Sequence, residues 1–343
     1  MSSSVKRFDH LKIPLADIKA ATNNFSERSR CAIDEFSTTY RGSLLVGGES
    51  IPISARRLYR RDGYGYGEVE FWREITLLSC LKHENIVSNI GYCDEEEDNY
   101  KYIIINKQET HESLDEYIRP RMIMIGWNQR LRVSVGIARA LSYIHYDEGR
   151  DLSIIHNDIK SSTILLDENF EPKLSSFGFS KIISVSERYG SHNAVLYYCA
   201  KTEYMDPAYK KTGEVSHKSD VYSLGIVLFE LLCGRLAIDN PPGQLDSFET
   251  IAKYHYENGN LGRLIDPALR EDQDMESFKS FSETAYSCLN QDPLKRPNIR
   301  QIVRLLEKAL ELRQRHENPL TPEIRPVVDV EDTSYRRLEV IYN

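Results

Sequence analysis

Long apolar runs and paired cysteines are both missing from this chain. In 343 residues no segment reaches the ~18 consecutive apolar residues of a membrane span, and the richest run, Val221 to Cys233, is short and contains Glu230. We therefore expect no membrane span. The six cysteines are scattered without a CxxC pair, so a disulfide-stapled fold is excluded, no zinc-site spacing exists, and we expect reduced thiols.

Positive charge is also in short supply. The chain has 44 Lys and Arg against 52 Asp and Glu, a net charge of −8, whereas a general nucleic-acid-binding protein usually carries a basic field. We expect no nucleic-acid partner. The N-terminus has no apolar stretch typical of a signal peptide, and Ser2 stands where N-myristoylation requires Gly. These features predict a cytoplasmic protein and leave peripheral association with the plasma membrane open.

The composition is that of a globular protein. It is 41% hydrophobic and 28% charged, which provides enough apolar material for a core. At roughly 150 residues per domain, the length corresponds to two domains or one large bilobal one. The pattern of apolar residues predicts four parts: a polar lead-in over 1–24, a small β-rich lobe over 25–109, a larger helical lobe over 110–312 and a flexible tail over 313–343.

The small lobe is predicted to hold one main helix among strands. Ile51, Ile53 and Ala55 alternate as in a half-buried strand, whereas apolar residues between 68 and 81 recur at helical spacing. In the second lobe, the segment from Asp220 to Leu232 is apolar on nearly every side, which predicts a central buried helix. The fold class is therefore α+β with two lobes, and a cleft between lobes is a usual place for a ligand.

One motif in the second lobe identifies a family. His156-Asn157-Asp158-Ile159-Lys160-Ser161-Ser162-Thr163 is followed ten residues later by Lys173-Leu174-Ser175-Ser176-Phe177-Gly178, and these segments resemble the catalytic and metal-binding loops of protein kinases. Further landmarks match in the same order, at residues 15–25, 83–87, 219–225 and 296–297. The resemblance covers residues 14–312 and implies a bilobal kinase fold. It is closest to plant receptor-like cytoplasmic kinases of the serine/threonine type.

The resemblance gives several residues a place in a kinase site. Asp158 occupies the position of the catalytic base. Lys160 occupies the position of the lysine that interacts electrostatically with this base, and a lysine there is typical of serine/threonine specificity. Glu74 lies on the apolar face of the predicted helix, at the glutamate that pairs with the nucleotide-binding lysine. Asn106 and Gln108 lie in the segment expected to receive adenine through backbone groups.

Four departures from the family's pattern affect the phosphates and the metal. Ala32 to Tyr40, at the glycine-rich loop, contains no glycine, and its Cβ atoms would obstruct close approach to phosphates. Arg56 replaces the lysine, and we expect it to form a bidentate ion pair with Glu74 that holds the small lobe closed. Thr163 and Ser176 replace the two Mg²⁺ ligands, and neither carries the charge that a hard cation prefers. Mg²⁺ is therefore not expected.

Two further departures concern regulation. Asn157 stands where kinases switched by activation-loop phosphate have Arg, so that switch is absent, although serines and tyrosines between Phe179 and Tyr209 remain available to another kinase. Ala208 stands where the family has Glu. Its usual partner, Arg296, then needs another acceptor, or this region is looser than in an active kinase.

Three functions are consistent with this pattern. The leading hypothesis is a pseudokinase that acts as a scaffold or allosteric partner of receptor-like kinases, so the expected partners are other protein kinases or receptor kinases. The first alternative is a weak or unconventional ATP-dependent serine/threonine kinase that uses Asp158 and Lys160. The second is a sensor that binds ATP without turnover, so ATP is left open as a ligand.

Overall fold

The small lobe of the structure, a computed structural model, is built on an antiparallel sheet with the order β1-β2-β3-β5-β4. The structure describes residues 6–34, 36–59, 67–96, 100–119, 125–147, 149–194, 202–239, 246–272 and 274–317. The strands of the sheet are β1 (Arg30–Ile33), β2 (Ser37–Val46), β3 (Glu49–Tyr59), β4 (Asn89–Cys93) and β5 (Tyr100–Lys107). The predicted alternation is present in β3, where Ile53 and Ala55 are fully buried.

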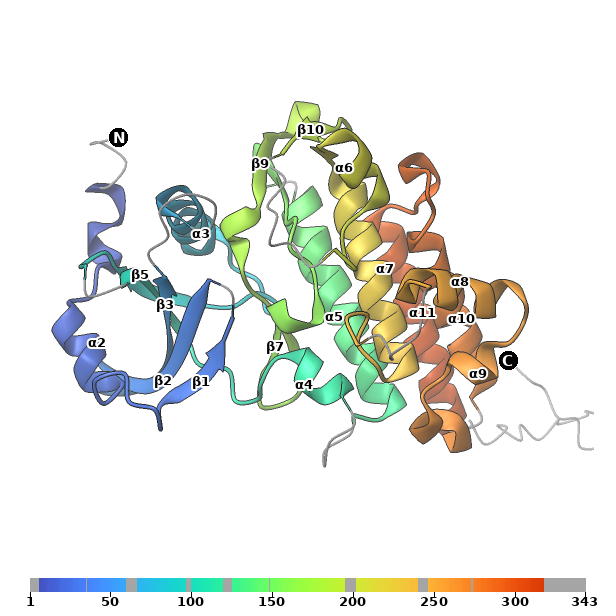
Figure 1. Cartoon of the computed structure of the whole chain (residues 1–343), viewed down its shortest axis with the longest axis horizontal. Helices are drawn as coiled ribbons and strands as arrows, with labels where there is room; N and C mark the ends of the chain where they lie inside the picture. Colours follow the sequence, from blue (N-terminus) through green and yellow to red (C-terminus); the bar gives the residue numbers. More distant parts are fainter. Residues whose placement is uncertain are drawn as a thin grey trace, which may run out of the picture.

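One long helix covers this sheet (Figure 1). Helix α3 (Glu68–Cys80) matches the predicted helix over 68–81, and it begins where the Glu70 carboxylate accepts the backbone N–H of Gly67 at 2.9 Å. Its apolar face buries Phe71 and Ile75 against the sheet. Glu74 lies on the same buried face, so the helix brings a carboxylate toward the cleft between the lobes.

The N-terminal segment predicted as a lead-in packs against the small lobe. It contains η1 (Lys6–Leu11) and α2 (Leu15–Ala21), and Ile18 of α2 is fully buried. A Cβ atom at Gly42 of β2 would lie 2.4 Å from the carbonyl oxygen of Ala21, so glycine is needed for this close approach. The backbone N–H of Ile13 also donates to Tyr92 of β4 at 2.8 Å.

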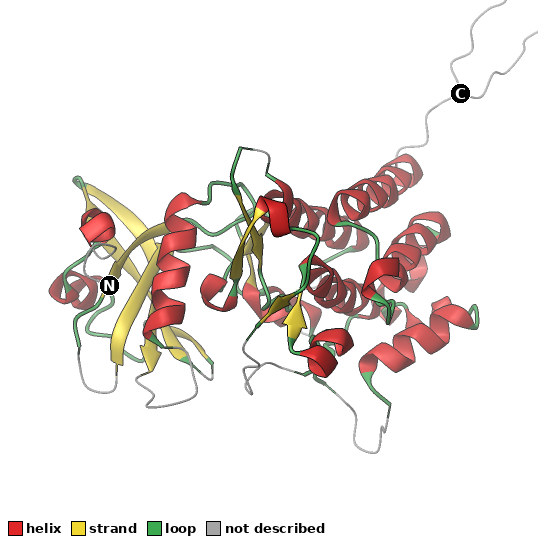
Figure 2. Cartoon of the chain, turned by 90° about the horizontal axis from the view of Figure 1, so that it is seen from above, coloured by secondary structure: helices red, strands yellow, loops and turns green. Residues whose placement is uncertain are grey.

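The larger lobe is mainly helical (Figure 2). Its helices are α4 (Leu114–Ile118), α5 (Trp127–Tyr146), α6 (Pro207–Thr212), α7 (His217–Cys233), α8 (Phe248–Glu257), α9 (Leu261–Leu264), α10 (Met275–Cys288) and α11 (Ile299–Glu317). As predicted, α7 is buried on nearly every side. Gly225 permits its close packing on α10, because a Cβ there would lie 2.8 Å from that of Cys288.

Short strands carry the loops that face the cleft. Two antiparallel pairs are formed by β6 (Leu152–Ile155) with β9 (Lys181–Ser184) and by β7 (Ile164–Leu166) with β8 (Pro172–Leu174). A third pair joins β10 (His192–Asn193) to β11 (Glu214–Val215). Short 3-10 helices are η2 (Ser161–Thr163), η3 (Phe177–Phe179), η4 (Val185–Glu187), η5 (Pro267–Asp272) and η6 (Pro293–Lys295).

Two predicted features fall partly beyond the described residues. The predicted tail begins inside α11, which runs to Glu317, and the rest of it lies outside the described residues. Residues 195–201, within the predicted activation loop, also lie outside them. In the part of the chain that the structure describes, no helix combines the length and apolarity needed to span a membrane.

Candidate active site

The loop between β6 and β7 is anchored to α7 by one carboxylate. Asp220 accepts the backbone N–H groups of His156 and Asn157, each at 2.8 Å, and its Oδ2 lies 2.8 Å from Nε2 of His145. Asn157 adopts a left-handed conformation with φ of 65°. Because Asp220 is 1% exposed on a buried helix, this anchor fixes the backbone that presents Asp158.

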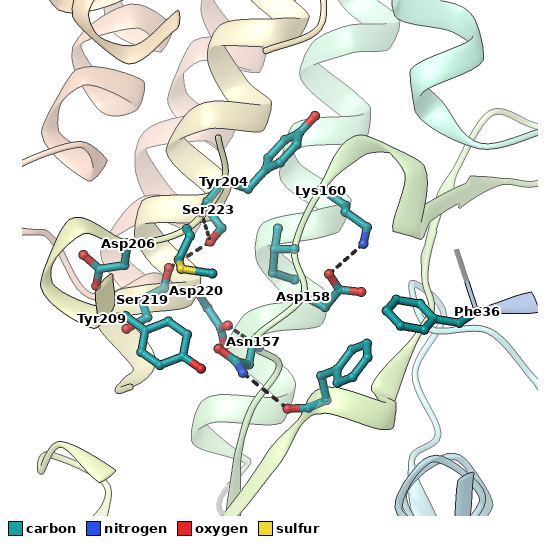
Figure 3. A pocket seen from close by; sticks show the side chains of 13 residues that line it. Phe36, Asn157, Asp158, Lys160, Tyr204, Asp206, Tyr209, Ser219, Asp220 and Ser223 are labelled. Atoms are coloured by element: carbon teal, nitrogen blue, oxygen red, sulfur yellow. Dashed lines mark hydrogen bonds and ion pairs between the residues drawn. The ribbon is translucent and has the colours of Figure 1, made fainter. Parts of the chain in front are cut away.

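Asp158 and Lys160 lie together, as predicted. The Lys160 ammonium is 2.8 Å from the Asp158 carboxylate (Figure 3). Burial raises the pKa of Asp158, whereas Lys160 acts in the opposite direction. Asp34 raises the pKa of Asp158 further and Arg56 lowers it, so both of these side chains lie close enough to act on the loop.

The hydroxyl of Thr163 is engaged within the loop itself. Its Oγ1 lies 2.9 Å from the carbonyl oxygen of Asp158 and 3.0 Å from that of Lys160, to which it donates. The backbone N–H of Lys160 also points at this hydroxyl, at 3.3 Å. Where a kinase has an Mg²⁺ ligand, the Thr163 hydroxyl therefore bonds to the backbone of its own loop.

Ser176 stands at the second metal position, in a left-handed backbone conformation. Its φ is 66°, and the next residue, Phe177, is fully buried edge-on against His156 at 4.7 Å between ring centroids. Thr163 and Ser176 offer hydroxyls rather than carboxylates. Among the residues described by the structure, no group of three or more His, Cys, Asp or Glu side chains could hold a metal. The donors present do not fit Mg²⁺.

The hairpin between β1 and β2 is closed by its own side chains. The Asp34 carboxylate accepts the backbone N–H groups of Phe36 and Ser37 and the Ser37 hydroxyl, all at 2.7 Å. Phe36 packs edge-on against Phe179, with ring centroids 5.6 Å apart, and both line the hollow beside Asp158 (Figure 3). Neither aromatic residue was predicted to lie at the site. The available signal was an aromatic residue within the segment that stands at the family's glycine-rich loop. Glu35 lies outside the described residues.

Helix α3 is fastened to the cleft at two points. Nη2 of Arg56 lies 2.6 Å from Oε2 of Glu74, and these side chains are 17% and 1% exposed, so the two residues pair as predicted, through this one contact rather than a demonstrated bidentate pair. One residue earlier, Nη1 of Arg73 donates to the carbonyl of Gly178 at 2.7 Å. Sequence reasoning gave no sign of this second contact, which joins α3 to η3.

Asn106 and Gln108 lie at the segment that connects the lobes. Oδ1 of Asn106 accepts from the Asn89 amide at 3.0 Å. The backbone N–H of Gln108 donates to Pro52 at 3.0 Å, so it is already used within the protein. Neither residue lines the hollow around Asp158.

Arg296 pairs with a carboxylate other than the glutamate that the family has at position 208. It forms a bidentate ion pair with Asp206, at 2.7 and 2.8 Å, and also donates to the carbonyls of Lys218 and Asn290. The sequence left two outcomes open, a substitute acceptor or a looser region. The first is observed, because Asp206 lies two residues before Ala208 and reaches the same guanidinium.

Comparison with known proteins gives the same family. Residues 58–305 match the protein kinase domain. The receptor-like protein kinase FERONIA of Arabidopsis thaliana is 36% identical over 302 residues, which is 87% of this chain and 32% of that protein. Receptor-like protein kinase HERK 1 of the same organism is 34% identical over 313 residues (91% and 36%), and ANXUR2 is 36% identical over 318 residues (90% and 35%).

The chain therefore spans about a third of the length of these relatives. The family match covers the small lobe only from residue 58 onward, continues through the larger lobe to residue 305 and includes the loop around Asp158. The predicted resemblance to receptor-like kinases is confirmed, and the chain belongs to the protein kinase domain family.

Proposed function

We propose that this protein is a pseudokinase that acts as a scaffold or allosteric partner of receptor-like kinases. The observation that carries this proposal is the chemistry of the two metal positions. Kinases hold two Mg²⁺ ions with an aspartate and an asparagine at these places. Here Thr163 and Ser176 bring neither a carboxylate nor an amide oxygen, and the Thr163 hydroxyl is bonded within its own loop.

The closed hairpin supports the same function. In kinases a glycine-rich loop covers the phosphates of ATP. In this chain the backbone amides of Phe36 and Ser37 donate to Asp34, so they are not free for a phosphate. The Asp34 carboxylate also places a negative charge near Asp158, which would repel a polyphosphate.

The contacts of α3 suggest what such a protein can still do. An active kinase needs the ion pair between its nucleotide-binding lysine and the helix glutamate. Here Arg56 and Arg73 make comparable connections from α3 to the rest of the chain with groups of the protein itself. A kinase-like surface held in this way can be offered to a partner kinase. We place such partners among receptor-like kinases, in the cytoplasm or at the inner face of the plasma membrane.

A weak serine/threonine kinase is the second candidate. The ion pair between Asp158 and Lys160, at 2.8 Å, favours it, because these are the groups that position the hydroxyl acceptor in the family. Without a metal and a phosphate clamp, this pair aligns only one of the two reactants. We therefore rank it below the pseudokinase.

A phosphorylation assay separates the two candidates. The full chain is incubated with radiolabelled ATP and either Mg²⁺ or Mn²⁺, alone and with a generic protein substrate, next to the Asp158→Ala variant. The pseudokinase predicts equal, background incorporation for both proteins. Incorporation by the wild type that disappears in the variant would overturn the proposal in favour of the weak kinase.

A further inference from the structure

Residues 6–18, which we call the N-terminal strap, pass around the edge of the small-lobe sheet that β4 forms. At its start, Phe8 is 6% exposed and belongs to the buried cluster between α3 and the sheet, together with Ile104 of β5. At its end, Ile18 is fully buried in a second cluster, together with Ile103 of β5. Because successive side chains of a strand point to opposite faces of a sheet, the strap has one anchor on each face.

Between these anchors the strap is bonded to β4 through its backbone. The N–H of Ile13 donates to the carbonyl of Tyr92 at 2.8 Å, and Lys12 forms a parallel bridge with the same residue. A Cβ atom at Gly91 would collide with the carbonyl oxygen of Leu11, so glycine is needed for this close approach. The strap therefore has a fixed register along the edge strand.

Tyr92 connects the strap to α3. Its fully buried ring lies edge-on to Phe71 and Trp72 of that helix, with ring centroids 5.8 and 5.1 Å away. The next residue of α3 is Arg73, which donates to the carbonyl of Gly178 at 2.7 Å. A continuous series of contacts thus leads from the strap, through Tyr92 and α3, to η3 at the cleft, as energetic coupling between distant groups requires.

We infer that the N-terminal strap is a conformational device that sets the position of α3. With Phe8 in its cluster, α3 keeps its contacts with Arg56 and with η3; with Phe8 withdrawn, these contacts loosen and the surface that α3 offers to other proteins changes. Asp9, His10 and Lys12 are exposed, so a protein that binds the strap acts on α3 from outside the cleft. This control goes beyond the pseudokinase role and operates whether or not the cleft turns over ATP.

Hydrogen–deuterium exchange of the full chain, measured by mass spectrometry, tests this role of the strap. The informative variant is Phe8→Ala, which removes the ring from the cluster beside α3. The matched control is Ile18→Ala, which removes a fully buried side chain of the same segment from the cluster on the other face of the sheet. Both variants shorten a buried apolar side chain, so their comparison separates control of α3 from a general loss of stability.

We expect Phe8→Ala to raise the exchange of backbone amides in α3 and η3 about tenfold or more, and Ile18→Ala to leave η3 unchanged. If Phe8→Ala does not fold, the milder Phe8→Leu takes its place and should give the same pattern with a smaller increase. Equal exchange of η3 in the two variants would overturn the proposal. So would a folded Phe8 variant whose α3 and η3 are protected as in the wild type.

Coupling between two sites is reciprocal, so a change at the far end of α3 provides a second test. Arg73→Ala removes the contact with Gly178 and should raise the exchange of the hydrogen-bonded amides of Lys12 and Ile13 about fivefold or more. The matched control is Arg139→Ala, which removes an exposed ion pair of α5 and should leave these amides unchanged. Unchanged exchange of the strap in Arg73→Ala would show that the strap and α3 are independent and would overturn the proposal.

Discussion

The loop around Asp158 has two sides, one facing α7 and one facing the place where a kinase binds the phosphates of ATP, and the two sides carry different kinds of residue. On the side of α7, Asp220 holds the loop by two backbone hydrogen bonds, and the fully buried Glu230 accepts from the Tyr204 hydroxyl at 2.6 Å and from the Ala237 N–H at 2.7 Å. On the phosphate side, Asp34 and Thr163 bond to neighbouring groups of the chain, where a kinase would offer donors and ligands to ATP.

The difference follows from what each group supports. Groups on the α7 side are buried and partnered, so losing one leaves another without its hydrogen bond and costs folding free energy. Groups on the phosphate side of a kinase act mainly on the ligand, so replacing them changes catalysis with little effect on folding. A preserved kinase fold is therefore weak evidence for kinase activity. Variants on the phosphate side and on the α7 side can each test this difference.

The largest expected effect comes from rebuilding the phosphate side. The rebuilt variant carries Arg56→Lys, Thr163→Asn, Ser176→Asp, Asp34→Gly and Phe36→Gly. We expect autophosphorylation about 10³-fold or more above the wild type, because each restored electrostatic element of a phosphoryl-transfer site is worth factors of this order. The measurement is the initial rate of radiolabel incorporation.

Two controls sharpen this result. Adding Asp158→Ala to the rebuilt variant should abolish the gain. The variant with only Arg56→Lys, Thr163→Asn and Ser176→Asp should gain little, because Phe36 and Asp34 still close the hairpin. If those three changes alone gave the full rate, our account of the hairpin would be wrong.

The next effect in size concerns the substitute ion pair. Asp206→Ala leaves Arg296, which is 2% exposed, buried without a carboxylate, and should lower the free energy of unfolding by about 3–5 kcal/mol. Chemical denaturation measures the change. The matched control is Glu307→Ala, which removes a solvent-exposed ion pair and should cost less than about 1 kcal/mol. Similar small losses in both variants would show that Asp206 is not the essential partner.

A pH dependence should come from the α7 side. Burial lowers the pKa of His156 from 6.5 to about 4, and its hydrogen bonds fit the neutral ring, since Nδ1 accepts from Asp158 and Nε2 donates to Ser175. The unfolded chain therefore takes up the proton first. The contribution of neutral His156 to the free energy of unfolding is complete above pH 6.5. It is lost as the pH falls toward 4, by up to about 1.4 kcal/mol per pH unit.

The sign is tested by comparing His156→Gln with the wild type between pH 7.5 and pH 5, because Glu230, whose pKa burial raises to about 7, contributes in the opposite direction over the same range. His217, whose pKa burial lowers to about 2, should add a second contribution in the same direction as His156. Relative to the wild type, His156→Gln should lose less unfolding free energy as the pH falls from 7.5 to 5, whereas replacing the exposed His316 with Gln should not change the slope. An unchanged slope in His156→Gln would contradict the assignment.

The smallest predicted effect concerns the hairpin contact. Phe36→Ala removes the edge-on contact with Phe179 and should cost about 0.5–1.5 kcal/mol, the range for aromatic pairs. The control Ile33→Ala alters a side chain that is 61% exposed and should change stability by less than about 0.5 kcal/mol. Thermal unfolding compares the two variants. Equal melting temperatures would mean that Phe179 does not hold the hairpin.

Local patterns were enough to predict the elements of this fold. The helical spacing in residues 68–81 and the alternation at Ile53 and Ala55 each follow from burying one face, and α3 and β3 have these faces buried. The Arg56–Glu74 pair was also predictable, because the family resemblance places Arg56 and Glu74 at the lysine and the glutamate that pair in kinases.

Partners chosen by tertiary packing were not predictable in the same way. Asp206 and Arg296 are 90 residues apart, and nothing local shows that Asp206 reaches the guanidinium once Ala208 has replaced the usual glutamate. The bonds of Thr163 and the contact of Phe36 with Phe179 depend equally on how loops fold back. The packing of α2 on Gly42 was likewise not predictable from the sequence.

The central claim is that the phosphate side of the cleft no longer accepts Mg²⁺-ATP. A thermal-shift titration of the full chain with ATP, with and without Mg²⁺, tests it most directly, since a ligand at 100-fold its dissociation constant stabilises the folded state by roughly 2.7 kcal/mol. We predict no shift of the melting temperature in either condition. A shift that requires Mg²⁺ would contradict the account, because it would show that the chain binds the metal nucleotide despite Thr163, Ser176 and the closed hairpin.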